Sequence, residues 1–390
     1  MGLGLVWGPP VQASFPVVLP SCYRSVAISV EPDIFEVPRW RSVLAGPVVA
    51  AVTLSAALLA TQSAGVPLRD PDGVAGRRLM WVVLLVVVLV ALDVVVRAGR
   101  RTATLTPSRA AMQSVRRERW RWYRGVAVAS ALVSFYVSYL AYRNLKSVVP
   151  LLRPGELFDR QLAEFERGLF GGDPAALLHS LLGVGLQTQF LSVVYVLYLF
   201  FVPVSLALAM VFSRDLRGGL FYATALSMNW PLGAASYLLV PALGPVYATP
   251  ASFADLPASG ASSLQNLLLD QRLNFLADPV ASGAAQSIAA FASVHVSMIF
   301  TAAVAAHLLG LARPLRIGLW VLLALTIAAT IYLGWHYVVD DVAGIFIGLL
   351  ALALARVLTG YRRRSPRTAH AEGQADVMPA PEQSAVGAGV

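Results

Sequence analysis

The sequence predicts an all-α membrane protein, a polytopic bundle of about eight transmembrane helices. Of its 390 residues, 57% are hydrophobic and only 13% are charged. Several apolar runs approach the roughly 20 residues that a helix needs to cross a bilayer. Because lipid offers no hydrogen-bond partner to an unpaired main chain, such runs cross the membrane as helices. We therefore expect apolar side chains to face lipid as well as a packed interior.

The apolar runs place each expected helix to within a few residues. The expected spans are residues 43–63, 79–97, 125–145, 188–212, 218–240, 293–312, 315–334 and 338–358. Residues 1–38 contain several prolines without a sustained period, which predicts an irregular lead segment. Residues 359–390 are rich in Arg and then in Ala, Gly, Pro and Gln, which predicts a disordered tail. The membrane domain then divides into residues 39–124, with a cytoplasmic Arg-rich loop, and residues 125–358.

Clustered arginines predict the orientation, because Lys and Arg beside span ends are retained on the cytoplasmic side. The segment from Arg97 to Arg124, between the second and third spans, is rich in arginine. Counting spans from it places three further basic clusters on the same side: Arg214 and Arg217, Arg313 and Arg316, and Arg362, Arg363, Arg364 and Arg367. Both chain ends are then cytoplasmic, in a multi-pass protein of the plasma (inner) membrane. The alternative, in which Arg69, Arg77 and Arg78 mark the inside, requires every one of these clusters to lie outside.

The net charge and its distribution indicate which partners the protein is expected to bind. The net charge of +9 comes from arginines beside apolar runs, where they set orientation and contact anionic lipid, so membrane lipids are expected partners and nucleic acid is not. Cys22 is the only cysteine, so no intrachain disulfide can form. The sequence does not predict an oligomeric state.

Two short strings carry the candidate chemistry. Ser293 and His295 begin the sixth expected span, and His336 and Asp340 lie at the junction of the seventh and eighth. Counting spans places both strings at the extracytoplasmic boundary. Ser293 suits the N-cap of a helix, whose free amides and positive dipole end form an anion site.

His336 and Asp340 are four residues apart, so on a helix they share a face. The carboxylate can accept a hydrogen bond from one imidazole nitrogen while the other nitrogen faces a substrate. This arrangement produces a nucleophilic or basic histidine. The alternative interpretation is a structural ion pair at a helix start. A second histidine at the same boundary favours function, whereas His179 and His307 are interpreted as structural.

These motifs resemble the type 2 phosphatidic acid phosphatase superfamily, whose signature is K-x6-R-P, then P-S-G-H, then S-R-x5-H-x3-D. The string Ala292-Ser293-Val294-His295 resembles the second block, and His336-x3-Asp340 followed by Asp341-Val342-Ala343-Gly344 resembles the third. The His-Tyr pair and the Asp-Val-Ala-Gly ending are most similar to the branch related to inositol phosphorylceramide synthase, an inositolphosphotransferase. The resemblance implies a six-helix-type phosphatase core in the C-terminal two-thirds, residues 125–358.

The resemblance also implies roles for individual residues. His336 would attack phosphorus and carry the phosphoryl group, Asp340 would orient it, and His295 would protonate the leaving oxygen. No metal and no other cofactor would be required.

The first block is present but displaced. Lys146, the only lysine, begins a string that ends in Arg153-Pro154 and fits K-x6-R-P. The span count places it outside, where the cations could neutralise a phosphate. Two spans separate it from the second block, however, and a basic exit from a helix is the alternative interpretation.

Other positions depart from the pattern. Ala329 and Thr330 stand where the third block would have Ser and Arg, and Ala292 and Val294 replace the proline and glycine of the second block. The guanidinium that would clamp phosphate is therefore missing from its usual place. The candidate phosphate-binding side chains are Ser293, Lys146, Arg153 and Arg272, and the sequence does not choose among the three cations.

Two further segments have expected roles near the site. Residues 241–287 have the length and turn residues of a cap over it. The apolar residues from Phe158 to Phe170 recur at helical spacing between charged ones, which predicts a helix lying flat at the membrane interface. Such a helix would form a floor along which lipid reaches the site, and a partner-binding helix is the alternative interpretation.

The expected function is that of an integral-membrane lipid phosphatase or phosphotransferase. Its substrate would be a lipid phosphate or a phospholipid headgroup, and the reaction would pass through a phosphohistidine at the extracytoplasmic face. The alternative class is a lipid transporter, or an inactive protein whose histidines only bind headgroup phosphate.

Overall fold

The fold was analysed in a computed structural model, and the description covers residues 40–70, 73–213, 215–283 and 285–362. Most of these residues are helical, and none of them forms a strand. They all belong to one unit, Phe35–Val390. The predicted lead segment, residues 1–38, lies outside the described residues, and so do residues 363–390 of the predicted tail.

All eight expected spans are helices, which confirms the predicted all-α membrane class. They are α1 (Trp40–Ser63), α2 (Leu79–Thr102), α4 (Trp122–Leu152), α7 (Leu186–Phe212), α8 (Leu216–Leu239), α11 (Val294–Leu308), α12 (Arg313–Tyr332) and α13 (Val338–Thr359). Among the described residues, α1, α2, α4, α7, α12 and α13 are long and apolar enough to cross a membrane. The apolar helix α11 is shorter.

Helix α8 differs from these because it lies among other helices. It packs against α1, α4, α11 and α13, and most of its side chains are buried. A helix surrounded by protein can carry glycine and polar residues that a lipid-facing helix avoids. In α8 the buried Asn229 accepts a hydrogen bond from Ser297 of α11 and donates one of 3.2 Å to Thr301.

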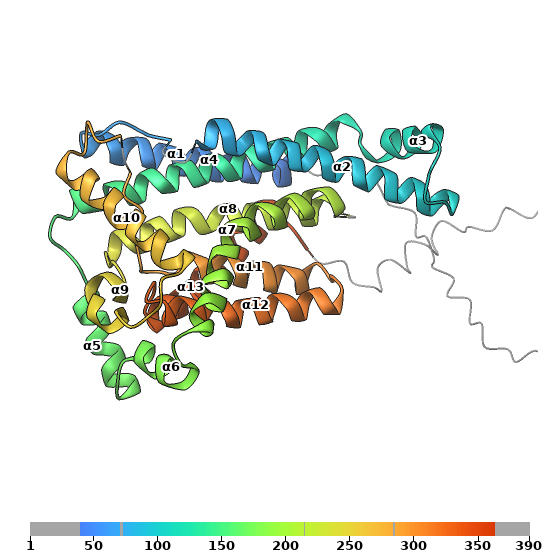
Figure 1. Cartoon of the computed structure of the whole chain (residues 1–390). Helices are drawn as coiled ribbons and strands as arrows, with labels where there is room; N and C mark the ends of the chain where they lie inside the picture. Colours follow the sequence, from blue (N-terminus) through green and yellow to red (C-terminus); the bar gives the residue numbers. More distant parts are fainter. Residues whose placement is uncertain (1–39, 71–72, 214, 284, 363–390) are drawn as a thin grey trace, which may run out of the picture. The chain divides into compact units, whose positions relative to one another are not determined.

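Several short helices lie at the two ends of the bundle (Figure 1). Those between the spans are η1 (Val74–Arg78), α3 (Arg109–Arg119), α5 (Asp159–Phe170), α6 (Pro174–Leu182), α9 (Pro245–Ala248), η2 (Pro250–Phe253) and α10 (Gly260–Ala277). In Figure 1, α5, α9 and α10 lie at the left-hand end, here called the capped end, and α3 lies at the opposite end. The segment expected as a cap, 241–287, therefore contains helices of its own.

A buried ion pair fixes α3 at the end opposite the cap. The Asp93 carboxylate of α2 is 1% exposed, and it accepts a 2.7 Å hydrogen bond from Arg119 and a 2.9 Å bond from Arg97. Arg119 also donates to the carbonyls of Val211 and Ser213 at the end of α7. Because its guanidinium satisfies both a buried carboxylate and a helix C-terminus, Arg119 holds α2, α3 and α7 together.

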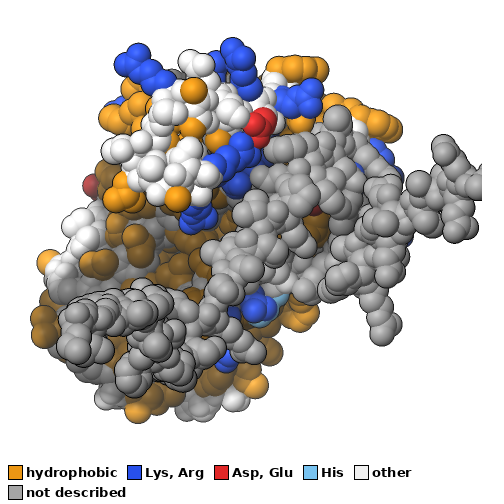
Figure 2. All heavy atoms as spheres, turned by 90° about the vertical axis from the view of Figure 1, so that its right-hand side faces the viewer, with side chains coloured by type: hydrophobic (Ala, Val, Ile, Leu, Met, Phe, Trp, Pro, Cys, Tyr) orange, Lys and Arg blue, Asp and Glu red, His pale blue; other side chains and the backbone are white. Residues whose placement is uncertain are grey.

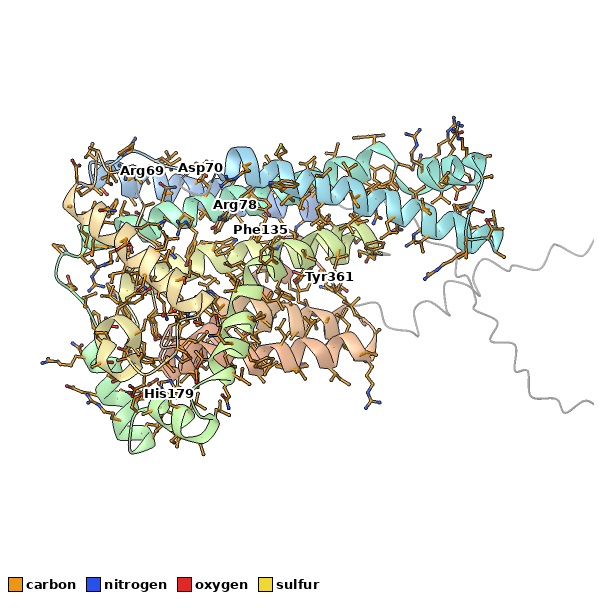
Figure 3. The ribbon with its side chains drawn as sticks, viewed as in Figure 1. Arg69, Asp70, Arg78, Phe135, His179 and Tyr361 are labelled. Atoms are coloured by element: carbon orange, nitrogen blue, oxygen red, sulfur yellow. The ribbon has the colours of Figure 1, made fainter. Side chains whose placement is uncertain are left out.

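At the capped end, the loop between α1 and α2 is tied to distant segments. The main chain of Arg69 exchanges two 2.8 Å hydrogen bonds with the buried Asn144 of α4. The Arg69 guanidinium donates to the carbonyls of Pro279 and Val280, at 2.7 and 2.6 Å. Figure 3 labels Arg69 at this end of the bundle. These contacts account for an arginine at the end opposite α3, where the orientation argument expects few.

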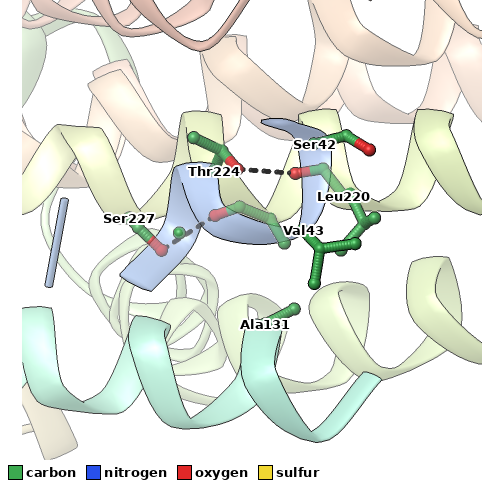
Figure 4. A pocket seen from close by; sticks show the side chains of 8 residues that line it. Ser42, Val43, Ala131, Leu220, Thr224 and Ser227 are labelled. Carbon is green, nitrogen blue, oxygen red and sulfur yellow. Dashed lines mark hydrogen bonds between the residues drawn. The ribbon is translucent and has the colours of Figure 1, made fainter. Parts of the chain in front are cut away.

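A narrow cavity lies inside the bundle between α1, α4 and α8 (Figure 4). Ser42 and Val43 of α1, Ala131 of α4, and Leu220, Thr224 and Ser227 of α8 line it. It is too narrow to admit a water molecule. The Thr224 and Ser227 hydroxyls donate to carbonyls of their own helix, Leu220 and Ala223. This cavity is a packing gap and has no part in the candidate site.

Candidate active site

A tight turn between α12 and α13 presents His336. Gly334 has a φ of +71°, a left-handed conformation that glycine adopts without steric cost. The Gly334 carbonyl accepts a 2.9 Å hydrogen bond from the Val246 amide, and the Trp335 amide donates to the Thr330 carbonyl at 2.9 Å. The cap segment and the end of α12 thus hold the turn, and His336 follows it with only 4% of its surface exposed.

The hydrogen bonds of His336 define its protonation pattern. Its Nδ1 lies 2.8 Å from the carbonyl oxygen of Ala290, and because a carbonyl only accepts, Nδ1 carries the proton. Nε2 therefore keeps its lone pair, and it lies 3.4 Å from Nδ1 of His295. Burial lowers the pKa of His336, although the charge of Asp341 acts in the opposite direction. A neutral imidazole with a free lone pair at Nε2 is the form that a nucleophile requires.

Asp340 is close to His336 but is not its nearest partner. Its Oδ2 lies 3.6 Å from Nδ1 of His336, beyond hydrogen-bond distance. The same oxygen accepts a 2.9 Å hydrogen bond from the Tyr337 amide at the start of α13. Asp340 thus fixes the first turn of α13 beside the imidazole, while the Ala290 carbonyl accepts the hydrogen bond from Nδ1 of His336.

The start of α11 is held against α13. The Ser293 hydroxyl accepts a 3.4 Å hydrogen bond from the Val296 amide as the N-cap of α11, and the Ser293 amide donates to the Asp340 carbonyl at 3.0 Å. A Cβ at Gly344 would lie 2.4 Å from the Ser293 carbonyl oxygen. The absence of a side chain at this position is what allows the two helices to bring His295 to His336.

A buried connector between α10 and α11, residues 285–292, links the candidate cations to the histidines. We call it the strap. The Gln286 side-chain amide donates to the Lys146 carbonyl at 2.6 Å and accepts from Arg272 at 3.3 Å. Ser287 accepts from Arg143, and Ala290 supplies the acceptor for His336.

The predicted cations differ in where they lie. Lys146 lies over the Tyr142 ring, 4.9 Å from its centroid, and its charge acts on both His295 and His336. Arg272 is buried beside the strap. Arg153 instead donates to the carbonyls of Leu238 and Leu239 at the end of α8. The structure therefore brings Lys146 toward the histidines, keeps Arg272 nearby, and uses Arg153 as a helix cap.

Thr330 occupies the position at which the third block has an arginine, and its side chain makes a different contact. Thr330, which is fully buried, donates a 2.8 Å hydrogen bond to the Asp341 carboxylate. The cationic groups near the histidines come from α4 and α10 instead.

Two carboxylates of α5 hold the turn from outside. Asp159 accepts from the amides of Leu243 and Gly244, at 2.8 to 3.0 Å, and from the Tyr337 hydroxyl at 3.2 Å. Glu166 accepts from the Val339 amide at 3.0 Å. The apolar side chains of the same helix, Phe165, Leu169 and Phe170, are exposed. Helix α5 thus faces the site with its acids and turns its apolar side away.

An aromatic group surrounds His295. The ring centroids of Tyr195 and Tyr198, both on α7, lie 4.7 and 4.3 Å from that of His295. Tyr195 also stacks on Trp335, with centroids 4.7 Å apart and planes inclined by 6°. Among the described residues, no group of three or more His, Cys, Asp or Glu side chains is arranged to hold a metal ion.

The other histidines lie apart from this pair. His179 of α6, labelled in Figure 3, approaches the Tyr332 carbonyl to 2.8 Å through Nε2. His307, near the end of α11, accepts a 2.8 Å hydrogen bond from Trp320. Neither contact involves the strap or the turn before α13.

The fold and these contacts define the class of protein: a helical membrane protein with a pair of histidines, one buried and one half-buried, at one end of its bundle. The profile of the PAP2 superfamily matches residues 160–354, half of the chain. The chain belongs to this superfamily, which supports an enzyme of the phosphatase or phosphotransferase type with a lipid substrate. Comparison with curated proteins and with solved structures finds no match.

The match includes some of the site and leaves other parts out. His295, His336, Asp340 and Arg272 lie within it, whereas Lys146 lies before it. Several groups that the structure brings to the site were not predicted from the sequence: Arg143, Asp159, Glu166, Tyr195, Tyr198 and the Ala290 carbonyl. No motif marks them, because each acts through a contact between segments far apart in the chain.

Proposed function

We propose that the protein transfers a phosphoryl group from a lipid phosphate or a phospholipid headgroup through a phosphohistidine on His336. The observation that carries the proposal is the orientation of His336. Its Nδ1 proton is bound by the Ala290 carbonyl at 2.8 Å, so the lone pair of Nε2 points toward His295, 3.4 Å away. One histidine is thereby prepared for attack on phosphorus, and a second lies beside it for proton transfer.

The reaction has two balanced steps. In the first, the Nε2 lone pair of His336 forms a bond to phosphorus, the ester P–O bond breaks, and the proton of His295 passes to the leaving oxygen. In the second, a water or hydroxyl oxygen attacks phosphorus and gives its proton to His295, and the P–N electron pair returns to His336. Because the histidines are within hydrogen-bond distance in the structure, the rings must part when a phosphoryl group binds.

Positive charge for the phosphoryl oxygens comes from outside the third block. Lys146 acts on both histidines, and Arg272 reaches the strap through Gln286. The amides that follow Ser293 add donors at the positive end of α11. Such fixed donors stabilise charge that develops in the transition state. In this proposal Lys146 is the principal cation, with Arg272 behind it, and Arg153 has no direct part.

The acceptor decides between a phosphatase and a headgroup transferase. Both share the first step and differ in whether water or a sugar or polyol hydroxyl completes the second. The His-Tyr and Asp-Val-Ala-Gly strings favour the branch related to inositol phosphorylceramide synthase, and a transferase remains part of the proposal on that ground. The capped end would face the extracytoplasmic side, because α3 and its arginines lie at the other end.

Trapping the covalent intermediate tests the mechanism. Purified protein is incubated with a lipid phosphate that carries labelled phosphorus and is then quenched in base. A phosphohistidine gives label that is stable to base and labile to acid. His336→Ala should remove this label and lower turnover at least ~10³-fold, because the nucleophile is lost.

His307→Ala is the matched control, since it removes a histidine with no contact to the strap, and it should keep the label. Turnover by His336→Ala at the wild-type rate would refute the assigned nucleophile. A transporter or an inactive lipid-binding protein would take up no label at all, which separates the alternative class from an enzyme.

A further inference from the structure

We infer that Tyr195 and Tyr198 of α7, here called the tyrosine pair, are positioning residues that hold His295 for protonation of a poor, alkoxide leaving group. This inference deepens the proposed function and rests on it. The observation behind it is that His295 contacts two tyrosine rings, with centroids 4.7 and 4.3 Å away. Neither tyrosine belongs to the motifs that identify the superfamily.

The contacts of His295 show why rings are needed. The hydrogen bond described for its Nδ1 is the one to His336 at 3.4 Å, and that bond must break when a phosphoryl group enters. The imidazole then depends on packing for its position. Helix α7 supplies two rings three residues apart, on one helix face, and both rings contact the imidazole of His295.

The rings also suit the charge that His295 must carry. A proton donor is an imidazolium before it reacts, and an aromatic face attracts a cation electrostatically. Lys146 acts on His295 with a charge of the same sign, and like charges repel each other. Two aromatic faces partly offset that repulsion without adding a carboxylate, which would repel the phosphate substrate.

Tyr195 connects the two halves of the site. Its ring stacks on Trp335 at 4.7 Å, nearly parallel, and Trp335 directly precedes His336. Trp335 in turn meets Tyr247 of the cap in an edge-to-face contact at 6.3 Å. The position of the proton donor is thus tied through side-chain packing to the turn that carries the nucleophile.

This role has a kinetic signature that depends on the leaving group. An alkoxide leaves slowly unless it is protonated, whereas 4-nitrophenolate leaves without help. Loss of the tyrosine pair should therefore slow phosphorylation of His336 by an alkyl ester and spare phosphorylation by an aryl ester. Hydrolysis of the phosphohistidine also needs His295, as a base, and should slow with either substrate.

The test compares two double variants in the full-length protein. Tyr195→Leu with Tyr198→Leu removes the rings, and Tyr195→Phe with Tyr198→Phe keeps them. The substrates are dioctanoyl phosphatidic acid and 4-nitrophenyl phosphate. In the Leu variant, kcat/KM for the alkyl ester should fall at least tenfold and kcat/KM for the aryl ester should stay within about threefold. The kcat and KM for the aryl ester should fall together, because the phosphoenzyme accumulates.

The Phe variant should resemble the wild type with both substrates, which separates the ring from the hydroxyl. Tyr222→Leu removes a buried tyrosine of α8 that bonds Ser205 at 2.9 Å, far from the motifs, and controls for core damage by giving no dependence on the leaving group. An equal loss on both esters, or no loss on either, overturns the inference. Loss of the Phe variant's activity on the alkyl ester also overturns it.

Failure of the proposed function is distinguishable from failure of this inference. His336→Ala is assayed in parallel. If it retains turnover, or if the wild type turns over neither ester, the proposed function fails and the role of the tyrosine pair fails with it. If His336→Ala is inactive and the Leu variant shows no leaving-group dependence, only the tyrosine pair is wrongly assigned.

Discussion

A main-chain carbonyl, rather than a carboxylate, accepts the hydrogen bond from Nδ1 of His336. The Ala290 carbonyl lies 2.8 Å from Nδ1, and the Asp340 carboxylate lies 3.6 Å away. Asp340 therefore does not accept the hydrogen bond from His336 that the sequence predicted. Asp340 acts by fixing the Tyr337 amide beside the imidazole, and the strap decides which nitrogen is protonated.

The protonation of the buried Glu166 side chain affects the stability of the fold. Burial raises its pKa to about 7, from a reference value of 4.5. The Val339 amide, which donates to the carboxylate, acts in the opposite direction, and the charge of Asp340 raises the pKa further. Because the pKa is higher in the folded protein than in the unfolded chain, the folded protein binds more protons between these two values. The stability contributed by this group therefore falls as the pH rises from 4.5 through about 7.

Glu166→Gln removes this titration while it keeps an oxygen that can accept from the Val339 amide. Relative to the wild type, the variant should become more stable as the pH is raised from about 5 to about 8. Thermal unfolding in detergent at several pH values measures the difference. Glu164→Gln is the control, because Glu164 is an exposed acid on the same helix. Parallel pH profiles of wild type and Glu166→Gln would show that Glu166 is not buried against α13.

At the scale of elements, the site depends on how closely α11 and α13 approach. Their contact passes through Gly344, whose Cα faces the Ser293 carbonyl. Ser293 in turn is bonded to the Asp340 carbonyl. A change of a few tenths of an ångström between these helices alters the distance between His295 and His336, and hence proton transfer.

Gly344→Ala should therefore reduce both stability and activity. The new methyl group would lie 2.4 Å from the Ser293 oxygen, and overpacking of this kind costs about 1–3 kcal/mol. Thermal unfolding and turnover in the same detergent measure the two effects. Gly318→Ala on α12 is the matched control, since a Cβ there meets nothing within 4 Å. Equal behaviour of the two variants would mean that α11 and α13 can separate without loss.

The elements also show how far the sequence could predict the structure. The eight expected helices were predictable because long apolar runs have few other places to go, and among the described residues six of them are long and apolar enough to cross a membrane. The helix at residues 159–170 was predictable from its spacing, but its buried acids were not. Its spacing indicated an apolar face for lipid, whereas Asp159 and Glu166 use the polar face to hold the turn before α13.

The site was predictable only in part, for a related reason. His295, His336 and Asp340 could be brought together because each lies at a span end on one side of the membrane. The contacts of the strap could not be predicted, since nothing in the sequence of residues 285–292 indicates that Ala290 meets His336 or that Gln286 meets Lys146. Contacts between irregular segments leave no period in a sequence, and the cap segment is such a case.

For the whole molecule, the two ends of the bundle differ in the groups that they present. The capped end carries α5, α9 and α10, and α3 lies at the other end (Figure 1). Figure 2 looks at that other end, where Lys and Arg side chains are prominent on the described surface and acidic ones are sparse. The expectation of an extracytoplasmic site rests on the basic side chains at this end.

Labelling of introduced cysteines tests the orientation. The background carries Cys22→Ser, which removes the only natural thiol. Ala254→Cys lies at the capped end, after η2, and Leu105→Cys lies between α2 and α3; both positions are exposed. A thiol reagent that does not cross membranes should label Ala254→Cys in intact cells and Leu105→Cys only after permeabilisation. The reverse pattern would place the histidine pair on the cytoplasmic side.

The tie made by the loop between α1 and α2 limits how this protein can be divided. Residues 160–354 match the superfamily, but a fragment of that length would lose the Arg69 contacts to Pro279 and Val280. Gln286 would lose its acceptor on Lys146, and α8 would lose α1 and α4 as neighbours. The portion inherited from the superfamily is therefore not a portable module: transplanted alone, it would expose a polar central helix to hydrocarbon.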